Sequence, residues 1–273
     1  MRVGLLQLRS SDDPAANLPV TLNHVRDAAG QGAALIVTPE VTNCVSADRA
    51  HQKTVLRPEA EDPTLAALQQ AAAELGVHVL IGSLAVKTEE ERFANRSFLV
   101  SPDGQIVARY DKIHMFDVEV SETESYRESA GYRPGETAVV TRIGDVGVGI
   151  TVCYDVRFPH LYRLLAQNGA QILTIPSAFS PVTGAAHWEP LLRARAIETG
   201  CFVLAPAQSG QHEAQAGRPR KTYGHSMVVG PWGEVLLDMG EEPGVVVLDL
   251  DLDQVDTARR RVPSLTADRP FTI

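Results

Sequence analysis

Apolar and polar positions in the first half of the chain follow two alternating patterns. Short apolar runs are typical of buried strands, and they alternate with stretches in which apolar residues recur every three or four positions, as on one face of a helix. Strands that alternate with helices predict an α/β fold in which helices pack on the outside of sheets. The expected strands are Val3–Leu8, Ala33–Val37, Val77–Gly82, Arg96–Val100 and Gln105–Tyr110, and the expected helices are Ala15–Ala29 and Pro63–Leu75.

The same alternation resumes after a polar, irregular segment, Asp111–Gly135, whose length is typical of functional or disordered loops. The final part has the pattern of antiparallel strands around Gly- and Pro-containing turns, and it ends in an extended stretch after Val262. No linker, low-complexity tract or fixed-period repeat divides the sequence, so residues 1–273 are expected to form a single domain. The expected strands here are Thr137–Thr141, Val146–Val152, Ala170–Ile175, Cys201–Ala205, Thr222–Val229, Glu234–Leu237 and Val245–Leu250, with helices at Pro159–Gln167 and Ala186–Glu198.

Composition narrows the class of protein. Of the 273 residues, 44% are hydrophobic and 22% charged, which is ordinary for a globular enzyme. The 34 acidic and 25 basic residues give a net charge of −9, and basic residues are scattered apart from the run Arg259–Arg261, so nucleic acid is not an expected partner. The N-terminal apolar run Val3–Leu8 is too short for a signal-peptide core or a membrane span, so we expect no membrane association and a cytoplasmic location.

Three cysteines stand far apart without a CxxC pair, so the sequence offers neither a disulfide framework nor a thiolate zinc site. Cys153 follows the strand Val146–Val152 and precedes a helix, and this is where open α/β sheets bind ligands. Backbone N–H groups at such a position can lower the pKa of a thiol. The same pattern also suits a small buried side chain, and for Cys44 and Cys201 we favour that structural interpretation.

A thiol nucleophile needs a base, and none of the eight histidines stands in a local signature, so a Cys–His pair stays open. Glu40 ends the strand Ala33–Val37 and would serve as base if burial raised its pKa towards neutrality. Lys112, just after Gln105–Tyr110, could stabilise an oxyanion. Taken alone, Glu40 and Lys112 are each compatible with an ordinary solvated side chain. Three strands that end in a carboxylate, an ammonium and a thiol together favour a carbonyl-attacking hydrolase.

Three motifs around these residues carry a family resemblance. They are Ile36–Glu40 (IVTPE), Tyr110–His114 (YDKIH) and Cys153–Pro159 (CYDVRFP), and the chain resembles the nitrilase superfamily of carbon–nitrogen hydrolases over nearly its whole length. The departures are Thr38 before Pro39, Asp111 before the lysine, and a long loop at 208–221. Similarity to the Nit-type amidase branch rests on the stretches Phe116–Val118, Pro176–Phe179, Thr183–Trp188, Leu192–Glu198 and Tyr223–Val229.

The resemblance implies a four-layer α-β-β-α sandwich. It also implies a homodimer or higher homo-oligomer formed through helices that flank the sheets and a C-terminal tail at 262–273, with no metal or organic cofactor. The implied chemistry has Glu40 deprotonate Cys153, whose thiolate attacks an amide carbon while Lys112 and the backbone N–H of Tyr154 hold the oxyanion. Water then hydrolyses the thioester, and Glu128 helps to position substrate or water.

For the substrate, Arg157 lies four residues beyond the nucleophile and could grip a carboxylate, although a structural arginine that caps the following helix fits equally well. Phe179 and Thr183 would line the same pocket if the branch assignment holds. The branch implies deaminated glutathione as substrate, and hence a role in metabolite repair. The alternatives are an ω-amidase for short 2-oxo acid amides, an N-carbamoyl amidohydrolase, a true nitrilase, and a non-catalytic scaffold with the same fold.

Overall fold

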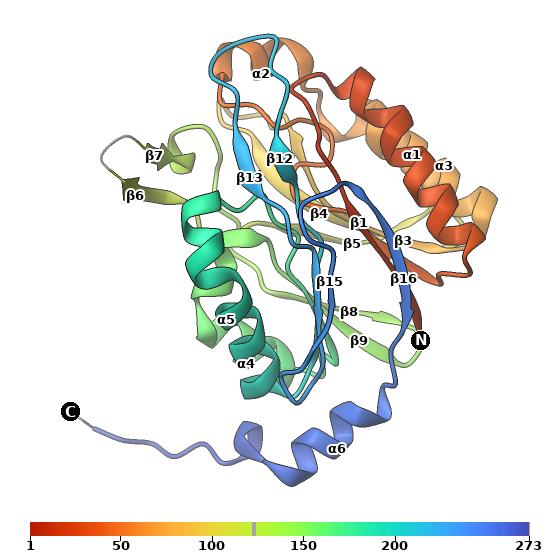
Figure 1. Ribbon diagram of the computed structural model, residues 1–273, viewed down its shortest axis with the longest axis vertical. Helices are drawn as coiled ribbons and strands as arrows, with labels where there is room; N and C mark the ends of the chain where they lie inside the picture. Colours follow the sequence, from red (N-terminus) through yellow and green to blue (C-terminus); the bar gives the residue numbers. More distant parts are fainter. Residues whose placement is uncertain (122–123, 273) are drawn as a thin grey trace.

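Two six-stranded sheets lie face to face between two layers of helices in the computed structural model, which describes residues 1–121 and 124–272 (Figure 1). The first sheet has the order β16-β1-β2-β3-β4-β5, and its strands β1, β2 and β3 are parallel. Its strands are β1 (Arg2–Gln7), β2 (Leu35–Val37), β3 (His78–Val86), β4 (Ala94–Val100), β5 (Ile106–Asp111) and β16 (Gly244–Asp249). Helices α1 (Pro14–Gly30) and α3 (Pro63–Leu75) cover its outer face.

The second sheet repeats this arrangement with the order β15-β14-β11-β10-β9-β8, in which β9, β10 and β11 are parallel. Its strands are β8 (Val139–Ile143), β9 (Val146–Ile150), β10 (Ile172–Thr174), β11 (Phe202–Ala205), β14 (Met227–Val229) and β15 (Val235–Asp238). Helices α4 (Pro159–Gln167) and α5 (Pro181–Thr199) cover the face turned away from the first sheet. The C-terminal strand β16 returns to pair with β1, so the last strand completes the first sheet.

Side chains that alternate along the strands build the layers. On β2, Leu35 and Val37 enter the core between the two sheets, whereas Ile36 packs under α1 and α3. The next strand does the same, with Leu80 between the sheets and Val79 under the helices. Each fully buried aliphatic side chain of this kind contributes about 1.5–3 kcal/mol. The four-layer α-β-β-α sandwich is confirmed.

Local signals explain why some boundaries were predicted well. Helix α3 begins after Asp62, whose carboxylate accepts from the Leu65 N–H, and Pro63 occupies its first turn. It ends at Gly76, which adopts the left-handed conformation. Helix α4 also begins at a proline and matches its predicted range, Pro159–Gln167.

Other elements differ from the sequence-based expectation. Helix α5 begins at Pro181, five residues before the expected Ala186, because Pro181 fits the first turn of a helix. The expected strand Thr222–Val229 is split into β13 (Lys221–Tyr223) and β14, since Gly224 and His225 have φ values of 75° and 55°. The expected irregular segment Asp111–Gly135 contains a hairpin. Its strands are β6 (Asp117–Ser121) and β7 (Glu124–Arg127). Further elements that were not expected are α2 (Arg49–Val55), β12 (Ser209–Gln211) and α6 (Asp253–Arg261).

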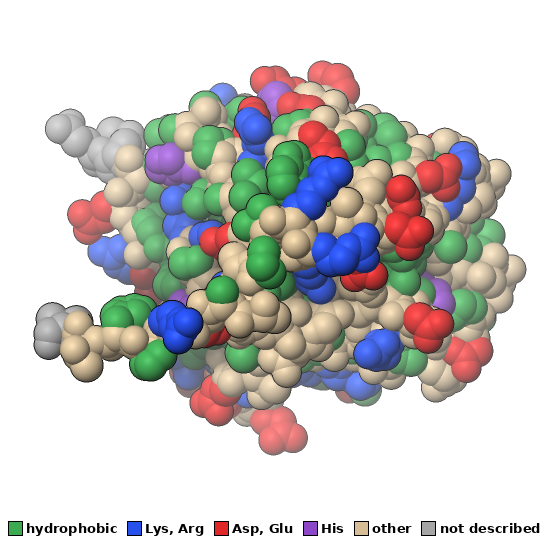
Figure 2. Space-filling model, turned by 90° about the horizontal axis from the view of Figure 1, so that it is seen from below, with side chains coloured by type: hydrophobic (Ala, Val, Ile, Leu, Met, Phe, Trp, Pro, Cys, Tyr) green, Lys and Arg blue, Asp and Glu red, His purple; other side chains and the backbone are tan. Residues whose placement is uncertain are grey.

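The C-terminal segment leaves α6, forms one 3-10 turn and then follows helix α4. Gln167 of α4 donates to the Leu265 carbonyl at 2.9 Å, and Arg163 pairs with Asp268. Beyond this contact Phe271 is 90% exposed, and the segment projects from the body of the protein (Figure 2). Residue 273 of the expected tail lies outside the described residues. No helix in the described part of the chain is long and apolar enough to cross a membrane.

Gly82 sets the distance between the two sheets near their carboxyl ends. A Cβ atom there would lie 1.9 Å from the Thr38 carbonyl oxygen and 2.5 Å from the Pro176 Cβ, which no packing tolerates. The missing side chain therefore lets the loop after β2, which carries Glu40, approach the loop after β10.

Candidate active site

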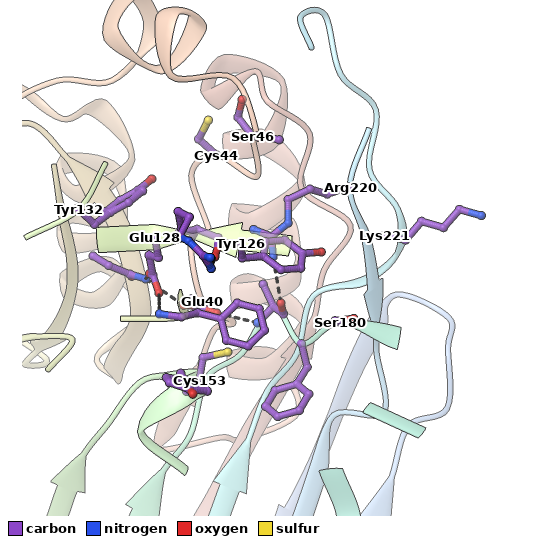
Figure 3. Close-up of a pocket in the computed structure, with 18 of the residues that line it drawn as sticks. Glu40, Cys44, Ser46, Tyr126, Glu128, Tyr132, Cys153, Ser180, Arg220 and Lys221 are labelled. Atoms are coloured by element: carbon purple, nitrogen blue, oxygen red, sulfur yellow. Dashed lines mark hydrogen bonds between the residues drawn. The ribbon is translucent and has the colours of Figure 1, made fainter. Parts of the chain in front are cut away.

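A cavity of about 760 Å³ opens at the end of the sandwich where the parallel strands of both sheets finish. Glu40, Lys112, Glu128 and Cys153 line its floor (Figure 3). Glu40 follows β2 and Lys112 follows β5 of the first sheet. Glu128 follows β7, and Cys153 follows β9 of the second sheet. The three strand exits predicted from the sequence are therefore brought together, and Glu128 joins them.

Cys153 occupies a constrained turn. It begins the 3-10 helix Cys153–Arg157 with φ at 48°, in the left-handed region that non-glycine residues rarely adopt. Its N–H donates to the Pro176 carbonyl at 3.0 Å, which fixes the turn against the neighbouring strand exit. Backbone conformations of this kind cost about 1–3 kcal/mol and concentrate at functional sites. The side chain is 7% exposed and lines the cavity.

Glu40 is held at both carboxylate oxygens. Its Oε1 accepts from Lys112 Nζ at 2.9 Å and from Asn95 Nδ2 at 2.9 Å, and its Oε2 accepts from the Ala178 N–H at 2.8 Å. The next residue, Val41, has φ at 46°, a strained value for a β-branched side chain. The Cys153 thiol lies close enough to Glu40 for the two groups to shift each other's pKa. The carboxylate is thus oriented towards the sulfur.

Lys112 links the two glutamates. Its ammonium, 2% exposed, donates to Glu128 Oε2 at 2.8 Å as well as to Glu40. Glu128 Oε2 also accepts from the Phe116 N–H at 2.6 Å. A buried cation between two carboxylates is compensated, and its position is fixed from two sides. We infer that Glu128 orients Lys112.

The charges in this cluster set the protonation states. Burial would raise the pKa of Glu40, but the charge and hydrogen bond of Lys112 outweigh it and hold the pKa below the ordinary 4.5. The expectation that burial would move this pKa towards neutrality was therefore wrong. Burial alone would lower the pKa of Lys112, yet the carboxylates of Glu128 and Glu40 raise it well above its ordinary value. Glu40 is ionised and Lys112 is protonated near neutral pH.

The Cys153 thiol has the opposite tendency. Burial first, and the Glu40 carboxylate next, raise its pKa, and the Lys112 charge and the Ala178 N–H offset only part of this. The expectation of a thiol pKa lowered by backbone N–H groups was wrong, because the thiol is buried and the Glu40 carboxylate is close to it. The resting group is a neutral thiol beside an ionised carboxylate, so a nucleophilic thiolate must form by proton transfer to Glu40.

Asp155 supports the turn that carries the sulfur, and sequence reasoning did not single it out. Its carboxylate accepts from the Tyr110 hydroxyl at 2.7 Å and from the Val152 N–H at 2.8 Å. It also lies 2.7 Å from His114 Nδ1, and the His114 ring stacks on Phe158. Asp155 therefore joins the motif Tyr110–His114 to the motif Cys153–Pro159. Asn95 was missed as well, because in the sequence it is one of three consecutive polar residues of β4 and only the structure shows that it is buried.

The four expected substrate-binding residues divide into two pairs. Tyr154 and Phe179 line the cavity, whereas Arg157 and Thr183 are not part of its lining. The Arg157 guanidinium lies behind the wall, with its Cζ 5.6 Å from the centre of the Phe179 ring and 5.8 Å from that of Tyr154. Thr183 donates to the Ser180 carbonyl at 3.5 Å in the first turn of α5.

Cys44 also lines the cavity, and its Sγ donates to the Asp12 backbone carbonyl at 3.6 Å. Burial first, with the charge of Asp12, raises the pKa of this thiol to about 12. Cys201 lies outside the cavity lining, and burial raises its pKa too. Among the residues that the structure describes, no group of three or more His, Cys, Asp or Glu side chains could hold a metal ion.

A four-layer sandwich with a buried Glu–Lys–Cys cluster defines a hydrolase of carbon–nitrogen bonds. Residues 2–260 match the carbon-nitrogen hydrolase family, and the chain belongs to that family. It is 38% identical over 266 residues to a deaminated glutathione amidase from Synechocystis sp., covering 95% of each chain.

Two solved structures share the fold. The Saccharomyces cerevisiae protein Nit3, a member of branch 10 of the nitrilase superfamily, superposes with a TM-score of 0.86 at 28% identity, with 99% of this chain and 97% of that chain covered. The C. elegans NitFhit protein superposes with a TM-score of 0.90 at 32% identity. Here 98% of this chain covers 65% of the other, so NitFhit is the longer protein.

Proposed function

We propose that the protein is an amidase that hydrolyses deaminated glutathione, the 2-oxoglutaryl amide of cysteinylglycine, through a thioester on Cys153. The observation that carries the proposal is the ammonium of Lys112 clamped between Glu40 and Glu128 on the floor of the cavity that Cys153 lines. The activity named for the Synechocystis relative supports the choice of substrate. A cavity of about 760 Å³ also has the volume for a dipeptide derivative.

Acylation begins with the neutral thiol. Glu40 accepts the Cys153 proton as the sulfur attacks the amide carbon, and the carbonyl oxygen becomes an oxyanion. The Lys112 ammonium and the backbone N–H of Tyr154 stabilise that charge, and a single well-placed donor of this kind is worth about 10²–10³ in rate. Glu40 then returns the proton to the leaving nitrogen, the carbon–nitrogen bond breaks, and a thioester remains.

Deacylation uses the same groups in reverse. Glu40 takes a proton from a water molecule that attacks the thioester carbon, and the same donors hold the second oxyanion. The proton returns to sulfur as the carboxylic acid leaves. Glu128 keeps the ammonium in place through both steps, and Tyr154 and Phe179 form walls of the cavity. Direct binding of substrate by Arg157 or Thr183 stays a prediction.

Substrate profiling tests this proposal. We expect the highest kcat/KM for deaminated glutathione, a lower value for 2-oxoglutaramate, and negligible turnover of simple nitriles, with release of 2-oxoglutarate as the common readout for the two amides. The reason is that the cavity is larger than a short 2-oxo acid amide needs, and unused binding energy lowers transition-state stabilisation. A clear preference for 2-oxoglutaramate would instead make the protein an ω-amidase, and release of carbon dioxide from N-carbamoyl amino acids would assign that activity.

We also propose that the protein is a homodimer that buries its α4–α5 face. Large apolar side chains are exposed on this side, with Ile197 of α5 57% and Trp232 56% exposed, and the C-terminal segment runs along α4. Sedimentation equilibrium is expected to give about twice the 29.5 kDa chain mass. Ile197→Asp should shift the protein towards monomer, whereas Val20→Asp, at a 50% exposed position on α1 of the opposite layer, should not. The cytoplasmic location and a role in metabolite repair stay predictions.

A further inference from the structure

Arg220 stands at the cavity with most of its hydrogen-bonding capacity unused. Its Nη2 donates to the Ala178 carbonyl at 3.2 Å, and its guanidinium lies over the Tyr126 ring, with Cζ 5.6 Å from the ring centre (Figure 3). Its Nε–H is buried without a hydrogen-bond partner. Among the described side chains no carboxylate forms an ion pair with it. A guanidinium has five donors arranged to meet a carboxylate with two at once, so this group lacks an anion.

The surrounding charges have the sign that an anionic ligand requires. Glu40 and Glu128 are the acidic residues of the cavity lining, and Lys112 holds both. The rest of the charged lining is basic, although the chain as a whole carries a net charge of −9. Arg49 is occupied by the carbonyls of Ala130 and Arg127, and Arg218 and Lys221 are exposed, whereas Arg220 is a half-buried cation with a free donor. A basic cavity on an acidic protein attracts anionic substrates.

The position of Arg220 relative to Glu40 indicates which part of a substrate it meets. The backbone of Ala178 joins them, because its N–H donates to Glu40 and its carbonyl accepts from Arg220. The two side chains are thus separated by roughly 10 Å at most, one residue and two hydrogen bonds. Glu40 is the group that protonates the leaving nitrogen, so a group attached to that nitrogen starts within reach of Arg220. An amino acid or dipeptide spans about 3.5–7 Å, which fits this interval.

We propose that Arg220 binds the carboxylate of the leaving group, so that the enzyme selects amides whose amine portion is an amino acid or a short peptide with a free carboxyl end. This inference rests on the proposed function and deepens it. Arg220 comes from the long loop at 208–221, whose residues 218–221 line the cavity. This loop, one of the departures from the family pattern, would therefore supply selectivity for the leaving group. Arg157, behind Phe179, would remain a candidate for the acyl end.

The test compares deaminated glutathione with the same compound carrying a carboxamide in place of the glycine carboxylate. The wild-type enzyme is expected to prefer the carboxylate by about 10- to 100-fold in kcat/KM, the range for a charge-assisted pair. Arg220→Gln should bring this ratio close to one, mainly through a higher KM for the carboxylate substrate, and should leave turnover of the carboxamide within a few-fold. Arg220→Lys should keep an intermediate ratio, since it retains charge but loses the two-donor geometry.

Arg9→Gln is the matched control. Arg9 donates to the Ser209 carbonyl and so supports the same loop, but it does not line the cavity. An unchanged ratio in this variant is expected, and loss of the ratio in both variants would assign the effect to the loop rather than to the guanidinium. The inference is overturned if the wild type does not discriminate between the two substrates, or if Arg157→Gln abolishes the preference and Arg220→Gln does not. If the wild type hydrolyses neither substrate, the proposed function fails first and takes this inference with it.

Discussion

Cys153→Ala is expected to lower kcat/KM for deaminated glutathione by about 10⁴-fold or more, since no other group in the cavity can form the acyl-enzyme. The fold should be retained. Alanine inherits the same positive φ, so the strain of the turn is unchanged, and the Asp155 contacts that hold the turn do not involve the sulfur. We expect the free energy of unfolding to change by no more than about 1 kcal/mol. Turnover and thermal unfolding, measured on the same preparation, check both statements.

Cys44→Ala is the matched control, because Cys44 is a buried thiol in the lining of the same cavity. With its pKa raised to about 12 and its Sγ facing the Asp12 carbonyl, it has no path to the substrate carbonyl. This variant should keep more than a tenth of the wild-type kcat/KM. Wild-type rates in Cys153→Ala would show that the sulfur is not the nucleophile, and the proposed thioester mechanism would be wrong.

The layers of the fold were predictable where the signal is local. Alternation on β2 and β3, and caps such as Asp62 and Gly76 around α3, depend on residues close in sequence. Helix α6 was missed because Val255 and Ala258 are its buried residues and the rest is charged or polar, so no apolar face is visible before tertiary packing. The β6–β7 hairpin was missed because its strands are short, so the alternation of Val118 and Val120 with acidic residues did not stand out from the polar segment.

The site shows the same division. Glu40, Lys112 and Cys153 each follow a strand with a clear pattern, so their place at strand exits was predictable. The expectation that one sheet's edge gathers all three was wrong, because Cys153 follows a strand of the second sheet. Glu128 came from family resemblance. Asn95 and Arg220 were missed because their roles come from contacts across long separations, 55 residues in the case of Asn95 and Glu40. The expected direction of the Glu40 pKa shift was wrong, because the shift depends on a lysine 72 residues away in the sequence. Sequence patterns locate these side chains at strand ends, but the distances between the side chains in the fold decide which of them are ionised.

Glu40→Gln is expected to lower kcat/KM by about three orders of magnitude, because both acylation and deacylation lose their general base. The glutamine side chain also fits the hydrogen-bond donors around position 40 poorly. Oε1 accepts from Lys112 and Asn95 and Oε2 accepts from the Ala178 N–H, so the NH₂ of glutamine must face a donor in either orientation. A mismatch of this kind costs about 1–3 kcal/mol, so a lower thermal midpoint should accompany the loss of activity. Glu198→Gln, which removes a half-buried carboxylate paired with Arg195 away from the cavity, should retain activity.

The pH dependence separates loss of a base from mere loss of packing. Glu40 must be ionised to accept the thiol proton, and its pKa lies below the ordinary 4.5, so wild-type kcat/KM should stay level on the acidic side until the pH falls below that value. The stability of the fold depends on pH in the same direction. A carboxylate whose pKa is lowered by folding stabilises the fold above the pKa it has in the unfolded chain, and this contribution is lost as the pH falls through its pKa in the folded protein. The residual activity of Glu40→Gln should lack this acid limb and rise with hydroxide concentration instead, because solvent hydroxide must then remove the proton from a thiol whose pKa is raised. An acid limb near neutral pH in the wild type, still present in Glu40→Gln, would assign the base to another group and return a histidine to consideration.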